Sequence, residues 1–108
     1  MNQATVMGRL THDPELKTTK SGVSVSSNTI AVNRRQKDSE GNYIVDFIDF
    51  TVWKGTAEYL CNYVKKGDTV ILSGEIHQEK YEDRNGNQRS KYEIVGQSIE
   101  LCKSKNEN

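Results

Sequence analysis

Apolar and polar side chains alternate in five separate segments of this sequence, and that alternation constrains the fold more than any other feature. Successive side chains of a strand point to opposite faces, so alternation predicts strands with one buried face. The clearest segment is residues 46–53, DFIDFTVW, in which Ile48, Phe50 and Val52 share one face. The chain is therefore expected to consist mainly of strands.

Turn-forming residues separate these segments. Pro14 ends the first, because proline cannot donate a hydrogen bond to a strand ladder. Gly-Asn at 41–42 and Asn-Gly at 85–86 predict turns between paired strands. Inside strands, Gly8 indicates a close backbone approach or a bend, and Gly96 a bulge. The predicted strands are residues 4–10, 23–33, 43–54, 70–81 and 92–101.

Helical spacing of i, i+3, i+4 and i+7 occurs once, at Ala57, Leu60, Cys61 and Val64. Lys65 and Lys66 suit the negative end of this short helix, and Gly67 is placed to cap it. Five strands with one helix between the third and the fourth is the order of an OB-fold. We predict an all-β fold of this kind, a five-stranded Greek-key barrel with one short helix. A generic small α+β sheet is the alternative.

Composition narrows the class of protein. The 108 residues suffice for one hydrophobic core. Fifteen basic and 15 acidic side chains give no net charge, so the chain is not a polybasic duplex-binding protein. Two distant cysteines, Cys61 and Cys102, indicate neither a zinc site nor a disulfide framework. No signal peptide or membrane span is apparent, which predicts a cytoplasmic, nucleoid-associated protein that does not contact a membrane.

Catalytic patterns are missing from the sequence. His12 and His77 lie far apart, and no nucleophile, zinc-protease or phosphate-loop motif occurs. We therefore expect no enzymatic activity, no cofactor and no metal. A small barrel nuclease remains a rival, because carboxylate ligands need only converge in space.

Aromatic residues on the outward strand faces suggest a binding function. Phe47 and Trp53 share the face opposite Ile48, Phe50 and Val52, and their rings are expected roughly 20 Å apart at the usual rise per residue. Tyr81 falls opposite a predicted core series of Val70, Leu72 and Ile76. Stacking a base on an aromatic ring contributes about 1–3 kcal/mol without reading its sequence. Covering a second apolar cluster or a subunit interface is the competing interpretation.

Basic side chains lie in or beside the same strand segments and could pair with nucleic-acid phosphates. Affinity would then fall with salt at a slope of about 0.7 per phosphate neutralised on a single strand. The helix-end lysines 65 and 66 are equally explained by the helix dipole. Lys91 borders the second hairpin, as do Lys80, Arg84 and Arg89. The predicted nucleic-acid-binding cations are Arg34, Arg35, Lys37, Lys54, Lys66, Lys80, Arg84 and Arg89.

Over nearly its whole length the sequence resembles the bacterial single-stranded DNA-binding proteins (SSB). The resemblance lies in GRLTHDPELKTTKSG, IAVNRR, DFIDFTVWKGTAEYLCNYVKKGDTVILSGE and EKYEDRNGNQRSKYEIV. It implies an OB-fold over residues 1–102 that binds single-stranded DNA without sequence specificity and protects it in replication, recombination, repair or transfer. It also implies a homotetramer assembled partly through first strands, with a homodimer as the alternative. Three of the four stacking positions of the family fall on Phe47, Trp53 and Tyr81.

The sequence departs from the family pattern at three places. Gln36 stands where the family carries a fourth aromatic, and Asn28 where it carries a large apolar side chain. Residues 103–108, KSKNEN, are expected to form a short disordered tail in place of a long linker with an acidic tip, so tail-mediated partners are not expected. Natural minimisation and truncation would each explain this. An adaptor of a replication complex, similar to the primosomal replication protein N, is the alternative function.

Overall fold

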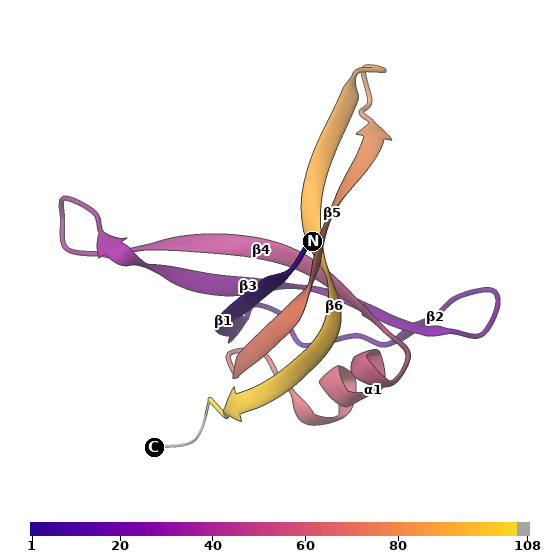
Figure 1. Cartoon of the computed structure of the whole chain (residues 1–108), viewed down its shortest axis with the longest axis horizontal. Coiled ribbons are helices and arrows are strands. Elements are labelled where there is room, and N and C mark those ends of the chain that lie inside the picture. Colours follow the sequence, from indigo (N-terminus) through magenta and orange to yellow (C-terminus); the bar gives the residue numbers. More distant parts are fainter. Residues whose placement is uncertain (106–108) are drawn as a thin grey trace.

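The computed structural model describes residues 1–105, and its strands close into a barrel (Figure 1). Hydrogen-bonded neighbours follow the order β1-β5-β6-β4-β3, and β3 pairs with β1 again to complete the circle. Among the strand pairs of residues 1–105, only β4 and β6 run parallel. The elements are β1 (Ala4–Leu10), β2 (Lys17–Thr18), β3 (Ser24–Lys37), β4 (Tyr43–Trp53), α1 (Lys54–Tyr63), β5 (Thr69–Glu82) and β6 (Gln88–Lys103). This closed five-stranded barrel with one short helix confirms the predicted OB-fold.

The core fills the barrel and continues under α1. Phe50 and Val52 of β4 are fully buried, as the alternation predicted. Ala57 and Leu60 of α1 are also fully buried, so the helix closes one end of the barrel. Burial of one large apolar side chain contributes about 1.5–3 kcal/mol. The remaining buried apolar residues are Leu10, Ile30, Val64, Val70, Leu72, Ile94 and Ile99.

Two glycines allow strands to come close to other groups. A Cβ on Gly8 would lie 2.3 Å from the carbonyl oxygen of Ala31, so a side chain has no room there. On Gly96 it would lie 2.7 Å from a methyl group of Val52. Gln97 is the extra residue where β6 shifts register against β5. The predicted close approach at Gly8 and the bulge at Gly96 are both confirmed.

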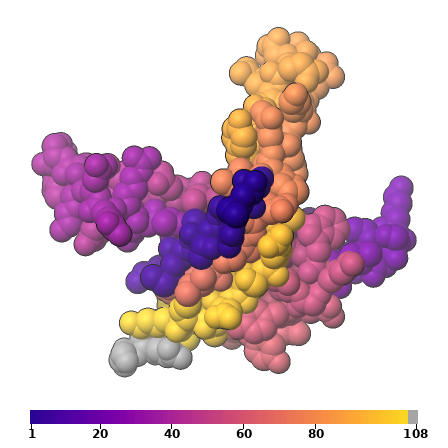
Figure 2. All heavy atoms as spheres, in the orientation of Figure 1, coloured from indigo at the N-terminus to yellow at the C-terminus, as the bar shows by residue number. Residues whose placement is uncertain are grey.

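The β3–β4 and β5–β6 hairpins extend beyond the barrel as two arms that point in different directions (Figures 1 and 2). Their tips have the same hydrogen bonds. Asp38 accepts backbone N–H groups from Glu40 and Asn42, each at 2.9 Å. In the other tip, Asp83 accepts the corresponding bonds at 2.9 Å. A glycine with positive φ completes each turn, +86° at residue 41 and +80° at residue 86. The turns predicted from sequence are therefore confirmed.

Three local predictions were wrong. β3 continues to Lys37 through a register irregularity after Asn33, so RRQ belongs to the strand and not to a loop. Ile76 is 46% exposed and outside the core, because the pairing of β5 with β1 ends at Gly74 and β5 is exposed from Ile76 onward. Gly67 does not cap α1: the C-cap is Val64, and the N–H of Gly67 donates to Leu10 O at 2.8 Å.

The polar residue Asn28 is buried with its hydrogen bonds made. Its side-chain N–H donates to His12 O at 2.9 Å, and its Oδ1 accepts the N–H of Thr29 at 2.8 Å. Satisfied groups of this kind avoid the penalty of burial without a partner. Asn28 therefore ties the segment after β1 to β3, which the sequence alone did not reveal.

At the C-terminal end, β6 continues to Lys103, one residue past the expected end of the domain. The N–H of Lys105 donates to Asp68 Oδ1 at 2.7 Å. Residues 106–108 of the expected tail lie outside the described residues. Within residues 1–105, no helix is long and apolar enough to cross a membrane.

Candidate nucleic-acid interface

The outer surface of β3, β4, β6 and β5 carries the three predicted stacking residues. Phe47 and Trp53 pair with outward residues of β3, and Tyr81 pairs with Arg89 of β6. Residues directly opposite in a sheet project from the same face. Phe47 is 69% exposed, Trp53 42% and Tyr81 49%. Their outward placement agrees with the alternation, while a role in stacking stays a prediction.

Hydrogen bonds between side chains join these strands across the outer surface. Thr29 Oγ1 donates to Asp49 Oδ1 at 2.8 Å and links β3 to β4. Thr51 Oγ1 donates to Glu93 Oε2 at 3.0 Å and links β4 to β6. Glu93 and Thr51 therefore lie on the same face as Phe47 and Trp53. The rings project from a surface that is held together by its own polar groups.

Three of the predicted cations already have partners. Arg34 Nε and Nη2 each donate to Asp46 at 2.9 Å, and this guanidinium lowers the pKa of the Asp46 carboxyl. Arg89 Nε donates to Asp83 Oδ2 at 2.9 Å. The ammonium of Lys37 lies 4.9 Å from the centre of the Tyr43 ring. A phosphate would have to displace or share these partners.

The other predicted cations are exposed and, within residues 1–105, have no side-chain hydrogen bond or ion pair: Arg35, Lys54, Lys66, Lys80 and Arg84. Lys54 directly follows Trp53 and has a φ of +55°, in the left-handed region. That conformation costs about 1–2 kcal/mol in a residue with a side chain. Strain therefore occurs at the junction of β4 and α1, beside a predicted stacking ring.

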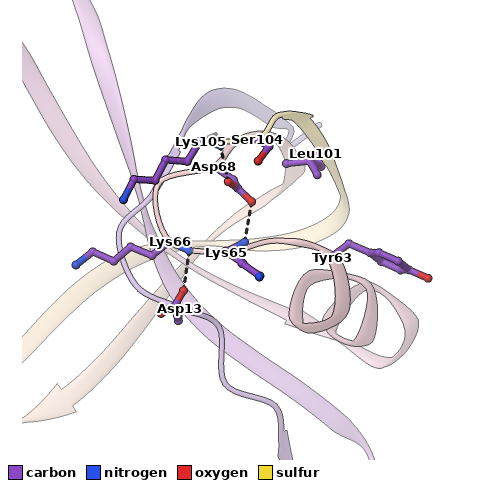
Figure 3. A pocket seen from close by; sticks show the side chains of 8 residues that line it. All are labelled: Asp13, Tyr63, Lys65, Lys66, Asp68, Leu101, Ser104 and Lys105. Atoms are coloured by element: carbon purple, nitrogen blue, oxygen red, sulfur yellow. Dashed lines mark hydrogen bonds between the residues drawn. The ribbon is translucent and has the colours of Figure 1, made fainter. Parts of the chain in front are cut away.

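Lys66 lines a hollow of about 420 Å³ formed by the end of α1, the loop that follows it and the end of β6, and none of the three predicted stacking rings lines this hollow. Figure 3 shows Lys65, Lys66 and Lys105 around two aspartates, Asp13 and Asp68. The aspartates accept backbone N–H groups, including that of Lys66 at 2.9 Å. The carboxylates of Asp13 and Asp68 therefore stabilise the backbone of these loops.

Acidic groups on the outer face were not among the predicted site residues. Burial, and secondarily hydrogen bonding of the protonated Glu93 carboxyl to the neighbouring Glu79, raise the pKa of Glu93. Lys91 Nζ lies 3.7 Å from Glu79. The alternation of DFIDFTVW places Asp49 on the face of the rings, which was the available signal. Glu93 could be found only from the pairing of β6 with β4.

No group of three or more His, Cys, Asp or Glu side chains suited to a metal ion occurs in the described part of the chain. The sequence pattern of the single-strand binding protein family matches residues 1–102. The chain belongs to the single-strand binding protein family.

Individual relatives agree with this membership. The chain is 38% identical over 108 residues to single-stranded DNA-binding protein 2 of Listeria monocytogenes serovar 1/2a, covering all of this chain and 68% of that protein. It is 40% identical over 108 residues to the single-stranded DNA-binding protein of Staphylococcus aureus strain MRSA252, covering all of this chain and 69% of that protein. The resemblance to SSB is confirmed, and members of this family bind single-stranded DNA.

Proposed function

We propose that this SSB family member binds single-stranded DNA with little sequence preference, by stacking bases on Phe47, Trp53 and Tyr81. The observation that carries the proposal is the exposure of three aromatic rings on one face of one sheet. Every base has a π-face, so each ring contributes about 1–3 kcal/mol with any base. Bound bases would also remove from water the apolar surface that these rings expose.

Cations beside the rings pair with the phosphates. Lys54 follows Trp53 directly, while Lys80 and Arg84 lie on the arm that carries Tyr81. Arg35 lies in the irregular part of β3, and Lys66 extends the set around the barrel end. Arg34, Lys37 and Arg89 contribute by exchanging their present partners for phosphate. Binding therefore weakens as salt is added.

The proposed role is to protect single strands exposed in replication, recombination, repair or transfer, without catalysis. The corresponding location is the cytoplasm, in association with the nucleoid. We further propose a homo-oligomer, a homotetramer as in the resemblance, that uses the edge of β1. This strand pairs with β3 only at Arg9 and Leu10, and Met7 on it is 59% exposed. Unpaired strand edges favour pairing with another chain.

Titration with oligo-dT of graded length, together with measurement of mass in solution, tests the proposal. An SSB should occlude tens of nucleotides per oligomer, and the salt slope should reflect several phosphates. Trp53→Ala should weaken binding by about 1–3 kcal/mol. Weak binding of a short stretch, with no cost from Trp53→Ala, would instead favour the adaptor function.

A further inference from the structure

Tyr43 is a third exposed aromatic residue on β4, and it begins the strand at the tip of the β3–β4 arm (Figure 1). Exposure alternates along all of β4, and the more exposed positions are the odd-numbered ones from Tyr43 to Trp53. Alternate residues of a strand project from the same face, so Tyr43 shares the face of Phe47 and Trp53. Tyr43 is 53% exposed. The face that carries the proposed stacking rings therefore continues onto the arm.

The spacing allows each ring to hold its own base. Tyr43 and Phe47 are four residues apart, which places them about 13 Å apart along the strand. The two rings can thus stack different bases of one extended nucleic-acid strand. Val45 lies between them on the same face and is 37% exposed, so the surface between the rings is also apolar. A strand that passes over Phe47 can therefore continue to Tyr43 without leaving β4.

The charge of this surface suits a polyanion. The outward positions 43, 45 and 47 of β4 lie opposite Lys37, Asn33 and Ala31 of β3. Residues directly opposite in a sheet project from the same face, and none of these six residues is acidic. Asp46 is at an even position, on the other face of β4, where Arg34 donates to it at 2.9 Å. No carboxylate of these paired positions therefore repels a phosphate on this face.

Lys37 provides a cation directly beside the ring. Its ammonium lies over one face of Tyr43, 4.9 Å from the ring centre. An aromatic ring has two faces, so the other face can stack a base. Lys37 makes no side-chain hydrogen bond or ion pair within residues 1–105, and its ammonium has three N–H donors. It can therefore donate to a phosphate next to the base that Tyr43 stacks.

We infer that Tyr43 is a further stacking platform, which extends the bound single strand from the barrel along the β3–β4 arm, with Lys37 as its phosphate partner. The inference rests on the proposed function, because the ring continues the same DNA surface. A contact between subunits is the competing role for an exposed ring. The cation held against Tyr43 favours a polyanion over a second copy of this chain.

The first measurement compares dissociation constants for labelled oligo-dT at several salt concentrations. Tyr43→Ala should weaken binding about fivefold or more, which is the low end of the range for one stacked base. Tyr43→Phe keeps the ring and should bind as the wild type does. Neither variant removes a charge, so both should keep the salt slope of the wild type. Lys37→Gln should reduce that slope by about 0.7.

Tyr92 offers a matched control on the other arm. It is 64% exposed and lies opposite Gln78. Because Gln78 is three residues before Tyr81 on β5, Tyr92 projects from the face opposite to that of Tyr81. Tyr92→Ala therefore removes an accessible tyrosine ring outside the proposed surface, and it should leave the affinity unchanged.

The second measurement moves the fluorescent reporter to the proposed platform. Trp53→Phe combined with Tyr43→Trp leaves one tryptophan, at position 43, and keeps an aromatic ring at position 53. Saturating oligo-dT should quench its emission. The corresponding variant with Trp53→Phe and Tyr92→Trp should keep its emission. Unchanged emission from position 43 would overturn the inference.

The remaining outcomes separate the two proposals. If Phe47→Ala weakens binding and Tyr43→Ala does not, the inference fails and the proposed function stands. A salt slope reduced in Tyr43→Ala as in Lys37→Gln would also overturn the inference, because the ring would then only position the lysine. A changed mass in solution with unchanged affinity would assign Tyr43 to a subunit contact instead. An equal loss in Tyr92→Ala would show that any exposed ring has this effect. If the wild type did not bind oligo-dT, both proposals would fail.

Discussion

The substitution Phe47→Ala separates binding from stability more clearly than any other change on β4. Phe47 is 69% exposed, so roughly a third of its side chain is removed from water in the free protein. Full burial of phenylalanine contributes about 1.5–3 kcal/mol, so the truncation should cost roughly 0.5–1 kcal/mol of unfolding free energy. Loss of one stacking ring should cost about 1–3 kcal/mol of DNA binding, roughly a 5-fold to 150-fold weaker dissociation constant.

The control for this experiment lies three residues away on the opposite face. Phe50 is fully buried, and Phe50→Ala should lower the unfolding free energy by about 3–5 kcal/mol. It removes no group from the proposed interface, so the fraction that remains folded should keep its affinity. Phe47→Ala is thus expected to weaken DNA binding with a small loss of stability, whereas Phe50→Ala is expected to lower stability and leave the affinity unchanged.

Two measurements are needed for each variant. Urea unfolding gives the free energy of unfolding, and fluorescence titration gives the affinity for oligo-dT, since Trp53 is retained as the reporter. A stability loss above about 2 kcal/mol in Phe47→Ala with unchanged affinity would refute the argument. The ring would then have to be covered by protein in solution, as at a subunit interface.

Three further substitutions test the local physics. Lys54→Gly should raise the unfolding free energy by up to about 1 kcal/mol, because glycine tolerates the φ of +55°. It should also reduce the salt slope of DNA binding by about 0.7. An unchanged slope would mean that Lys54 contacts no phosphate. Gly96→Ala should lower the midpoint of thermal unfolding, because its methyl group would lie 2.7 Å from Val52 and overpacking costs about 1–3 kcal/mol; a stable variant would show that the bulge can move. Glu93→Gln should stabilise the fold near neutral pH: a carboxyl with a raised pKa contributes stability at low pH that is lost as pH rises through that pKa, and glutamine keeps it. Thermal unfolding midpoints of this variant and the wild type should converge as pH falls toward 4, and a constant difference would contradict the argument.

The barrel could be predicted from the sequence because each pattern that indicates it lies within one short segment. Period-two alternation identifies a strand and its buried face, as at Phe50 and Val52. A glycine in a hairpin turn, or where two strands come close together as at Gly8, marks a backbone position that a residue with a side chain could not adopt without strain or a clash. The order of such elements then matches one common barrel.

The errors concern features that depend on distant parts of the chain. Ile76 continues the alternation of β5, yet the barrel has ended at that point and the arm exposes the side chain. The partner of Arg34 is Asp46, 12 residues away, which comes close because Asp46 lies opposite Val32, two residues before Arg34 on β3. No local pattern encodes either fact.

The site was predicted in the same partial way. The rings were found because their exposure breaks the rule that aromatics on a strand face the core. Glu93 was missed because a glutamate on an outward face is ordinary until β6 is known to lie beside β4. The hydrogen bonds from Thr29 to Asp49 and from Thr51 to Glu93 join three strands, so they have no signature in any one segment.

The central claim is that Trp53 is a stacking platform for single-stranded DNA, and its own fluorescence tests this most directly. The chain has one tryptophan, 42% exposed in the free protein, so any change reports on this position alone. Titration with oligo-dT at low salt should quench the emission to a plateau, and added salt should reverse the quenching. Unchanged emission at saturating oligonucleotide and low salt would contradict the claim.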